Sequence, residues 1–99
     1  MKLKDAYIFD MHNKYSWTIY RAWHLEGSVY QCHRYSFSVS PDGIVQAGYR
    51  GICVLDAAKH DLIDRQTAVA SCEAMVALAC PDAADYGFAA ERTFNQVQS

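Results

Sequence analysis

The first half of the chain alternates between apolar and polar residues, and three short breaks interrupt this alternation. Segments rich in aromatic and β-branched residues occupy 6–11, 15–23, 28–40 and 44–50, and each is expected to form a strand. The breaks between them are HNK, LEG and PDG, and two of the three end in glycine, as three-residue hairpin loops often do. Short breaks join neighbouring antiparallel strands, so the sequence predicts a four-stranded antiparallel meander in the order 1-2-3-4.

Loops of three residues would also fix which residues face each other across the strands. The predicted pairs are Met11 with Tyr15, His24 with Ser28, and Ser40 with Ile44. With these pairs, one face collects the bulky residues Tyr7, Phe9, Met11, Tyr15, Trp17, Ile19, Trp23, Val29, His33, Tyr35, Phe37, Val39, Val45, Ala47 and Tyr49. A shift by one residue would mix the two faces, so their separation supports the predicted sheet.

The second half of the chain has helical rather than alternating spacing. The segment 64–80 contains no glycine or proline, with Asp64 as the expected N-cap and Pro81 as the stop. The apolar residues Val69, Cys72, Met75, Val76 and Ala79 share one side of this helix. A helical turn over 56–61, capped by Asp56, and a second short helix after Asp82 are also expected. The predicted fold is therefore α+β: a single domain, 1–99, in which one or two helices from 52–99 cover one face of a sheet formed by 1–51.

Composition narrows the class of protein. The chain has 99 residues, of which 52% are hydrophobic and 20% charged, a globular balance. No apolar run reaches the roughly 20 residues of a membrane span, and the first residues lack the apolar core of a signal peptide. We therefore expect a cytoplasmic protein without membrane contact. The net charge of −2 by itself indicates neither a nucleic-acid partner nor a mimic of nucleic acid.

Four cysteines and four histidines raise the question of a metal or thiol site. The sequence contains no CxxC, HxH or HxxxH spacing. Cys32 and His33 are adjacent, and neighbouring residues of a strand point to opposite faces, so this pair cannot act together. We expect reduced, mostly buried thiols, and we assign no catalytic residue, no metal ligand and no cofactor-binding residue.

The polar face of the predicted sheet is the first candidate binding surface. It combines aromatic and small polar side chains, a mixture typical of recognition surfaces, at Tyr20, Tyr30, Arg34, Ser36, Ser38, Gln46 and Arg50. The predicted register places Arg34 directly opposite Arg50, and like charges across strands favour an anion between them. The second candidate surface is an acidic helix edge formed by Asp56, Asp61, Asp64 and Glu73.

These features favour a small non-enzymatic protein-binding module as the function. Phage and mobile-element inhibitors of host machinery, including anti-CRISPR proteins, are a class of such modules, and steric docking onto a larger protein complex is the expected mode of action. One alternative is a nucleic-acid-binding domain that uses the tyrosines and arginines of the sheet. A thiol-dependent enzyme is the second alternative, and pairing of two copies into a homodimer competes with all three hypotheses.

Overall fold

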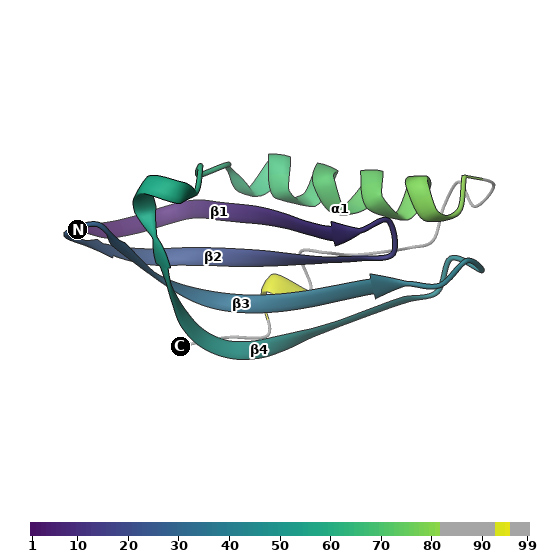
Figure 1. Cartoon of the computed structure of the whole chain (residues 1–99), viewed down its shortest axis with the longest axis horizontal. Coiled ribbons are helices and arrows are strands. Elements are labelled where there is room, and N and C mark those ends of the chain that lie inside the picture. Colours follow the sequence, from purple (N-terminus) through teal and green to yellow (C-terminus); the bar gives the residue numbers. More distant parts are fainter. Residues whose placement is uncertain (82–92, 96–99) are drawn as a thin grey trace.

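Four antiparallel strands and one α-helix make up most of the described chain. The computed structural model describes residues 1–81 and 93–95. The elements are β1 (Lys2–Asn13), β2 (Ser16–Glu26), β3 (Val29–Val39), β4 (Val45–Asp56), the 3-10 turn η1 (Ala57–Lys59) and α1 (Arg65–Ala79). The strands are ordered β1-β2-β3-β4 in one sheet (Figure 1), which confirms the predicted α+β meander. None of the helices described is both long and apolar enough to cross a membrane.

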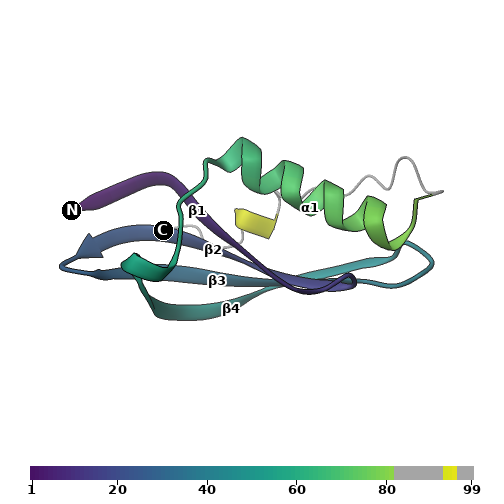
Figure 2. The same cartoon turned by 45° about the horizontal axis from the view of Figure 1, so that its top comes forward.

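The main core lies between the sheet and α1, as the alternation predicted. Its buried members come from three strands, from α1 and from the short turn at 93–94: Tyr7, Trp17, Ile19, Tyr35, Phe37, Val39, Ala68, Cys72, Met75, Val76 and Phe94. Figure 2 shows α1 lying along one side of the sheet. Phe94 lies against the rings of Tyr7 and Tyr35, with centroids 5.1 and 5.5 Å away, so the 93–94 turn fills the part of this face that α1 leaves uncovered.

The ends of α1 follow the expected capping chemistry. Asp64 Oδ1 accepts a hydrogen bond from the Thr67 backbone N–H at 2.7 Å. Hydrogen bonding with the Thr67 side chain, and then with its backbone, lowers the pKa of the Asp64 carboxyl. Asp56 caps η1 in the same way, through the Ala58 N–H at 3.0 Å. The helix stops at Ala79, before Pro81. The second helix predicted after Asp82 falls mostly outside the described residues, which include only 93–95 of that segment.

Two of the three predicted loops are shorter than expected. Residues 14–15 join β1 to β2 and residues 27–28 join β2 to β3, so Met11 faces Trp17 rather than Tyr15, and His24 faces Gln31 rather than Ser28. In the centre of the sheet both registers differ from the prediction by two residues, which leaves each side chain on its predicted face. The third loop is as predicted, since the Ser40 N–H donates to the Ile44 carbonyl across PDG.

A β-bulge in β4 is one of the register irregularities that the sequence did not predict; the others lie toward the ends of the β1–β2 and β2–β3 ladders. Tyr35 faces Tyr49 as expected, but Arg34 faces Gly51, so Arg50 is the extra residue and the predicted Arg34–Arg50 pair is wrong. Gly51 has φ +104°, a backbone conformation that residues with a side chain rarely adopt. Beyond the bulge β4 continues to Asp56, so residues 52–56 belong to the sheet and not to the helical cover.

The open face, the one opposite α1, carries a second and smaller core at one end. Its buried members are Ala6, Ile8, Ala22, Tyr30 and Cys32, with Leu55 and Ala57 packed against them. The chain closes this end after β4: η1 begins at Ala57, and Ile63 then pairs with Tyr7 on β1 through two backbone hydrogen bonds of 2.7 and 2.8 Å. Residues 57–63 therefore run from one edge strand to the other.

Candidate functional site: the open face and strand β4

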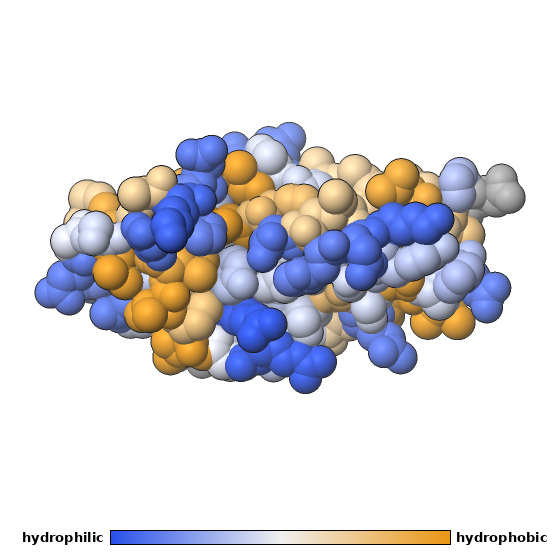
Figure 3. All heavy atoms as spheres, viewed as in Figure 1, coloured by the Kyte–Doolittle hydropathy of each residue, from blue (hydrophilic) through white to orange (hydrophobic). Residues whose placement is uncertain are grey.

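The rest of the open face is polar, as the sequence predicted. We call Tyr20, Arg34, Ser36, Ser38, Gln46 and Arg50 the polar face; all six are half-buried or exposed. Figure 3 shows hydrophilic side chains gathered over the middle of the sheet and hydrophobic ones toward η1. Tyr30 was predicted to belong to this surface, but it is buried in the smaller core, so it does not offer its ring to a partner.

Arg50 and Arg34 are the cations of the polar face. Arg50 Nε donates a 2.7 Å hydrogen bond to Ser36 Oγ, which holds the guanidinium against the sheet. Arg50 and Ser36 help to line a shallow hollow of about 370 Å³, together with Ser38 and Gln46. Arg34 stands between Tyr20 and Gly51 in the register. Burial raises the pKa of Tyr20, and the Arg34 charge opposes that shift.

The predicted acidic edge is divided among several places. The side chains of Asp56 and Asp64 cap η1 and α1. Asp61 lines a hollow of about 480 Å³ between β1, η1 and α1, whereas Glu73 lines a different one on α1 beside Arg65. Two of the four acidic side chains are therefore engaged as helix caps, and the other two line different hollows.

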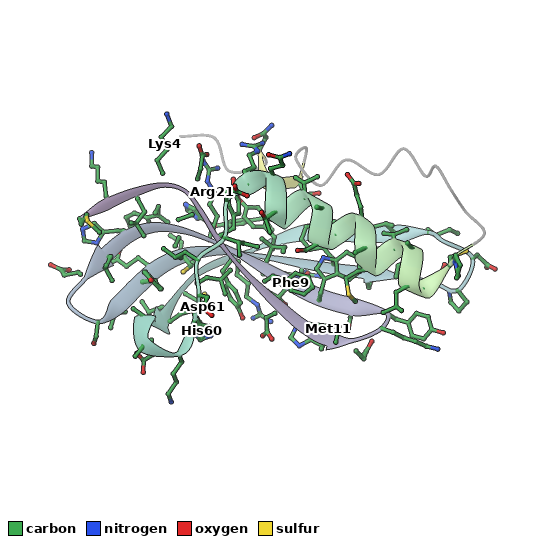
Figure 4. All side chains as sticks on the ribbon, turned by 90° about the horizontal axis from the view of Figure 1, so that it is seen from above. Lys4, Phe9, Met11, Arg21, His60 and Asp61 are labelled. Carbon is green, nitrogen blue, oxygen red and sulfur yellow. The ribbon has the colours of Figure 1, made fainter. Side chains whose placement is uncertain are left out.

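The hollow beside Asp61 also contains an oriented imidazole. His60 Nδ1 lies 3.2 Å from the Asp56 carbonyl oxygen, which can only accept, so Nδ1 donates this hydrogen bond and fixes the ring. Figure 4 shows His60 and Asp61 on the open side of the sheet, with Arg21 on the side of α1. Among the described residues no group of three or more histidine, cysteine or acidic side chains is placed to hold a metal ion.

A group of exposed apolar residues lies on the helix side of β2, β3 and β4, where α1 does not cover the sheet. We call Trp23, Val29, Ile52 and Val54 the apolar patch. Ile52 is 65% exposed and Val54 is 63% exposed, and in the register they stand opposite His33 and Gln31. This patch was not predicted, because the fourth strand was expected to end at residue 50. The run ICVL after Gly51, rich in β-branched residues, is the signal that would have extended it.

Aromatic rings connect the apolar patch to the main core. Trp23 stacks on His33 with centroids 5.9 Å apart, and His33 Nδ1 shares a 3.0 Å hydrogen bond with the Tyr49 hydroxyl. Burial, assisted by the charge of Arg21 on the neighbouring strand, lowers the pKa of His33. His33 therefore lies on the helix side, as predicted, in an environment that favours the neutral ring.

The environments of Cys32 and Cys72 are those of packed thiols that are not activated at neutral pH. Burial raises the pKa of both Cys32 and Cys72 to about 12, whereas catalytic cysteines have a lowered pKa. Cys72 Sγ lies 3.2 Å from Trp17 Nε1, which donates to it inside the core. The expected burial is confirmed for these two cysteines, while Cys53 and Cys80 are half-buried.

Comparison with known proteins finds no matching family model, no matching curated protein and no matching solved structure.

Proposed function

We propose that this chain is a non-enzymatic protein-binding module whose partner docks along β4. The observation that carries the proposal is the exposure of Ile52 and Val54, each almost two-thirds accessible, on the last strand of the sheet. Exposed apolar side chains that cluster, here with Val29 and Trp23, mark interaction sites more often than isolated ones do.

The backbone of β4 adds a second reason. Within the described residues, the ladder of β4 pairs only with β3, whereas the other edge strand, β1, is also paired with Ile63. Lysine, proline and bulges are among the features that protect edge strands; β4 has the bulge at Arg50 but contains no lysine or proline. An added partner strand would satisfy the outer N–H and C=O groups of β4, as in recognition by strand addition.

The side chains of β4 define the chemistry of such a partner segment. On the helix side, it would bury apolar residues against Ile52 and Val54. On the open face it would meet Arg50, which Ser36 already orients, and a guanidinium is best matched there by a carboxylate. The proposed ligand is therefore an extended protein segment in which apolar residues alternate with acidic ones.

Steric inhibition is the mode of action that we propose for this module. A module that blocks access to a larger protein complex needs a docking surface and no catalytic site. Phage or mobile-element inhibitors of the anti-CRISPR kind are the class that we expected to act in this way. The polar face, which adjoins β4, would extend the contact area on the open side.

The test compares two isoleucines that are equally exposed. Ile52→Lys changes the apolar patch, and Ile44→Lys places the same charge at a residue that is 63% exposed and precedes β4. The tagged full-length chain and both variants would be used to capture proteins from lysate of the native source, with quantification by mass spectrometry. We expect a protein that wild type and Ile44→Lys retain and that Ile52→Lys loses by at least about tenfold, or about 1.4 kcal/mol.

Equal retention by both variants, or no specific retention by wild type, would refute the proposal. Light scattering tests whether the apolar patch is instead covered by a second copy of the chain. A wild-type dimer that becomes a monomer in Ile52→Lys would show this. Nucleic acid is the other alternative. If the chain contacted phosphates, its affinity for a single-stranded oligonucleotide would fall steeply with salt concentration. The double variant Arg34→Glu with Arg50→Glu would then abolish this salt-dependent binding.

A further inference from the structure

Two cysteines far apart in the sequence face each other directly across β3 and β4. Cys32 and Cys53 are register partners. Directly opposed residues of antiparallel strands have Cα atoms about 4.5–5.5 Å apart, within the roughly 4.4–6.8 Å that a disulfide spans. Both are free thiols, and both belong to the smaller core on the open face.

The bulge creates this pair. Without the extra residue, the register that pairs Tyr35 with Tyr49 would continue and place Cys32 opposite Ile52, and Cys53 would point to the helix side. The insertion at Arg50 and Gly51 reverses the direction of every later side chain in β4. Cys53 therefore turns toward Cys32 because of the same distortion that exposes Ile52 on the other face.

We propose that Cys32 and Cys53 form a reversible disulfide by exchange with a low-molecular-weight disulfide, independently of the proposed protein-binding function. Cys53, the more accessible thiol, attacks first as its thiolate: a bond forms between Cys53 Sγ and one sulfur of the small disulfide, and the other sulfur leaves as a thiolate that takes up a proton. The Cys32 thiolate then attacks Cys53 Sγ and expels the second small thiol. In total the protein loses two protons and two electrons, and the small disulfide is reduced to two thiols.

The surroundings of the pair determine its rate and stability. Burial raises the pKa of Cys53, and the charge of Arg34 opposes that increase. Burial and the neighbouring Cys53 raise the pKa of Cys32 to about 12. Arg34 and Tyr20 are the other charged or titratable side chains that interact with the pair within the described residues. Since only the thiolates react, exchange is slow at pH 7, its rate increases about tenfold per pH unit, and Arg34→Gln slows it.

The product is strained and therefore easily reduced. Opposed Cβ atoms in a ladder lie about 4.5–5.5 Å apart, whereas disulfides bring them to about 3.5–4.5 Å. Forming the bond draws β4 toward β3, and strained disulfides have the more oxidising potentials of labile bonds. A thiol reductant should restore the dithiol in the folded protein.

The experiment treats the folded full-length chain with glutathione disulfide at pH 7 and pH 8 and maps the linkage by non-reducing digestion and mass spectrometry. We expect loss of two hydrogens and a Cys32–Cys53 crosslink that dithiothreitol reverses. Replacing Cys72 and Cys80 by alanine should leave the crosslink in place. Cys32→Ser should stop the reaction after its first step, with glutathione held on Cys53.

Two results would overturn the proposal. One is a folded wild-type chain that keeps both thiols alkylatable after prolonged exposure to glutathione disulfide. The other is a crosslink that forms only in denaturant or that joins other cysteines. Circular dichroism of each variant shows whether a lost crosslink is due to a lost fold. The experiment on the wild-type chain tests the proposal even if a variant fails to fold.

Discussion

Replacement of Gly51 by alanine tests whether the bulge depends on a glycine. A Cβ added at Gly51 would meet no atom within 4 Å, so the substitution creates no clash and its cost comes from the backbone alone. A side chain at φ +104° is expected to cost about 1–3 kcal/mol. Gly51→Ala also restricts the unfolded chain, which stabilises the protein by about 0.4–1 kcal/mol.

Gly48 provides a matched control three residues away in the same strand. It also has open space around the added Cβ, but its φ lies outside the left-handed region. Gly48→Ala has the same effect on the unfolded state, so that effect cancels between the two variants. Their difference in the free energy of unfolding is then the backbone cost at Gly51 alone, about 1–3 kcal/mol in favour of Gly48→Ala.

Urea unfolding followed by tryptophan fluorescence measures this difference. The slope with urea should stay the same in both variants while the midpoint of Gly51→Ala falls below that of Gly48→Ala. In thermal unfolding, each kcal/mol should lower the Tm by about 4–8 °C for a domain of this size. Equal stabilities of the two variants would show that β4 tolerates a side chain at the bulge, and the account of the register would be wrong.

Two further predictions concern the core and the pH dependence. Phe94→Ala should lower the free energy of unfolding by about 3–5 kcal/mol, because the ring is fully buried against Tyr7 and Tyr35. Urea unfolding measures this loss, with Leu78→Ala at an exposed position as the control. A loss as small as that of the control would contradict the packing. The pKa of His33 is lower in the folded state than in the unfolded chain, where it is about 6.5. The stability that the neutral ring contributes is therefore fully present above pH 6.5, and it is lost as the pH falls through the folded-state pKa. His33→Gln should therefore lose less stability than wild type between pH 7 and pH 5, and parallel profiles would refute the assignment.

Strand order and the separation of the two faces could be predicted because they depend on alternation alone. In the centre of the sheet the predicted registers of β1–β2 and β2–β3 differed from the structure by two residues, and an even shift leaves these side chains on their predicted faces. Tyr7, Trp17 and Phe37 are therefore buried where they were expected. The cap at Asp64 was predictable for a similar reason, since it depends on a local hydrogen bond.

The candidate sites were harder to predict because they depend on one inserted residue and on a long-range crossing. The bulge at Arg50 changes the face of every later residue in β4, and no alternation pattern reveals it before the partner strand is known. Tyr30 was assigned to the polar face because its parity is correct, but Leu55 and Ala57 pack around it once the chain crosses toward β1. Parity predicts the face of a side chain but not what covers that face.

The crossing by residues 57–63 makes the two outer edges of the sheet one mechanical unit. It begins where β4 ends and is fastened to β1 by the two hydrogen bonds between Tyr7 and Ile63, immediately before α1 begins. The hydrogen bonds at Ile63 therefore carry a load applied to the end of β4 to β1, the opposite edge of the sheet, before it reaches α1. The two edge strands are joined by this short connection as well as through the strands between them.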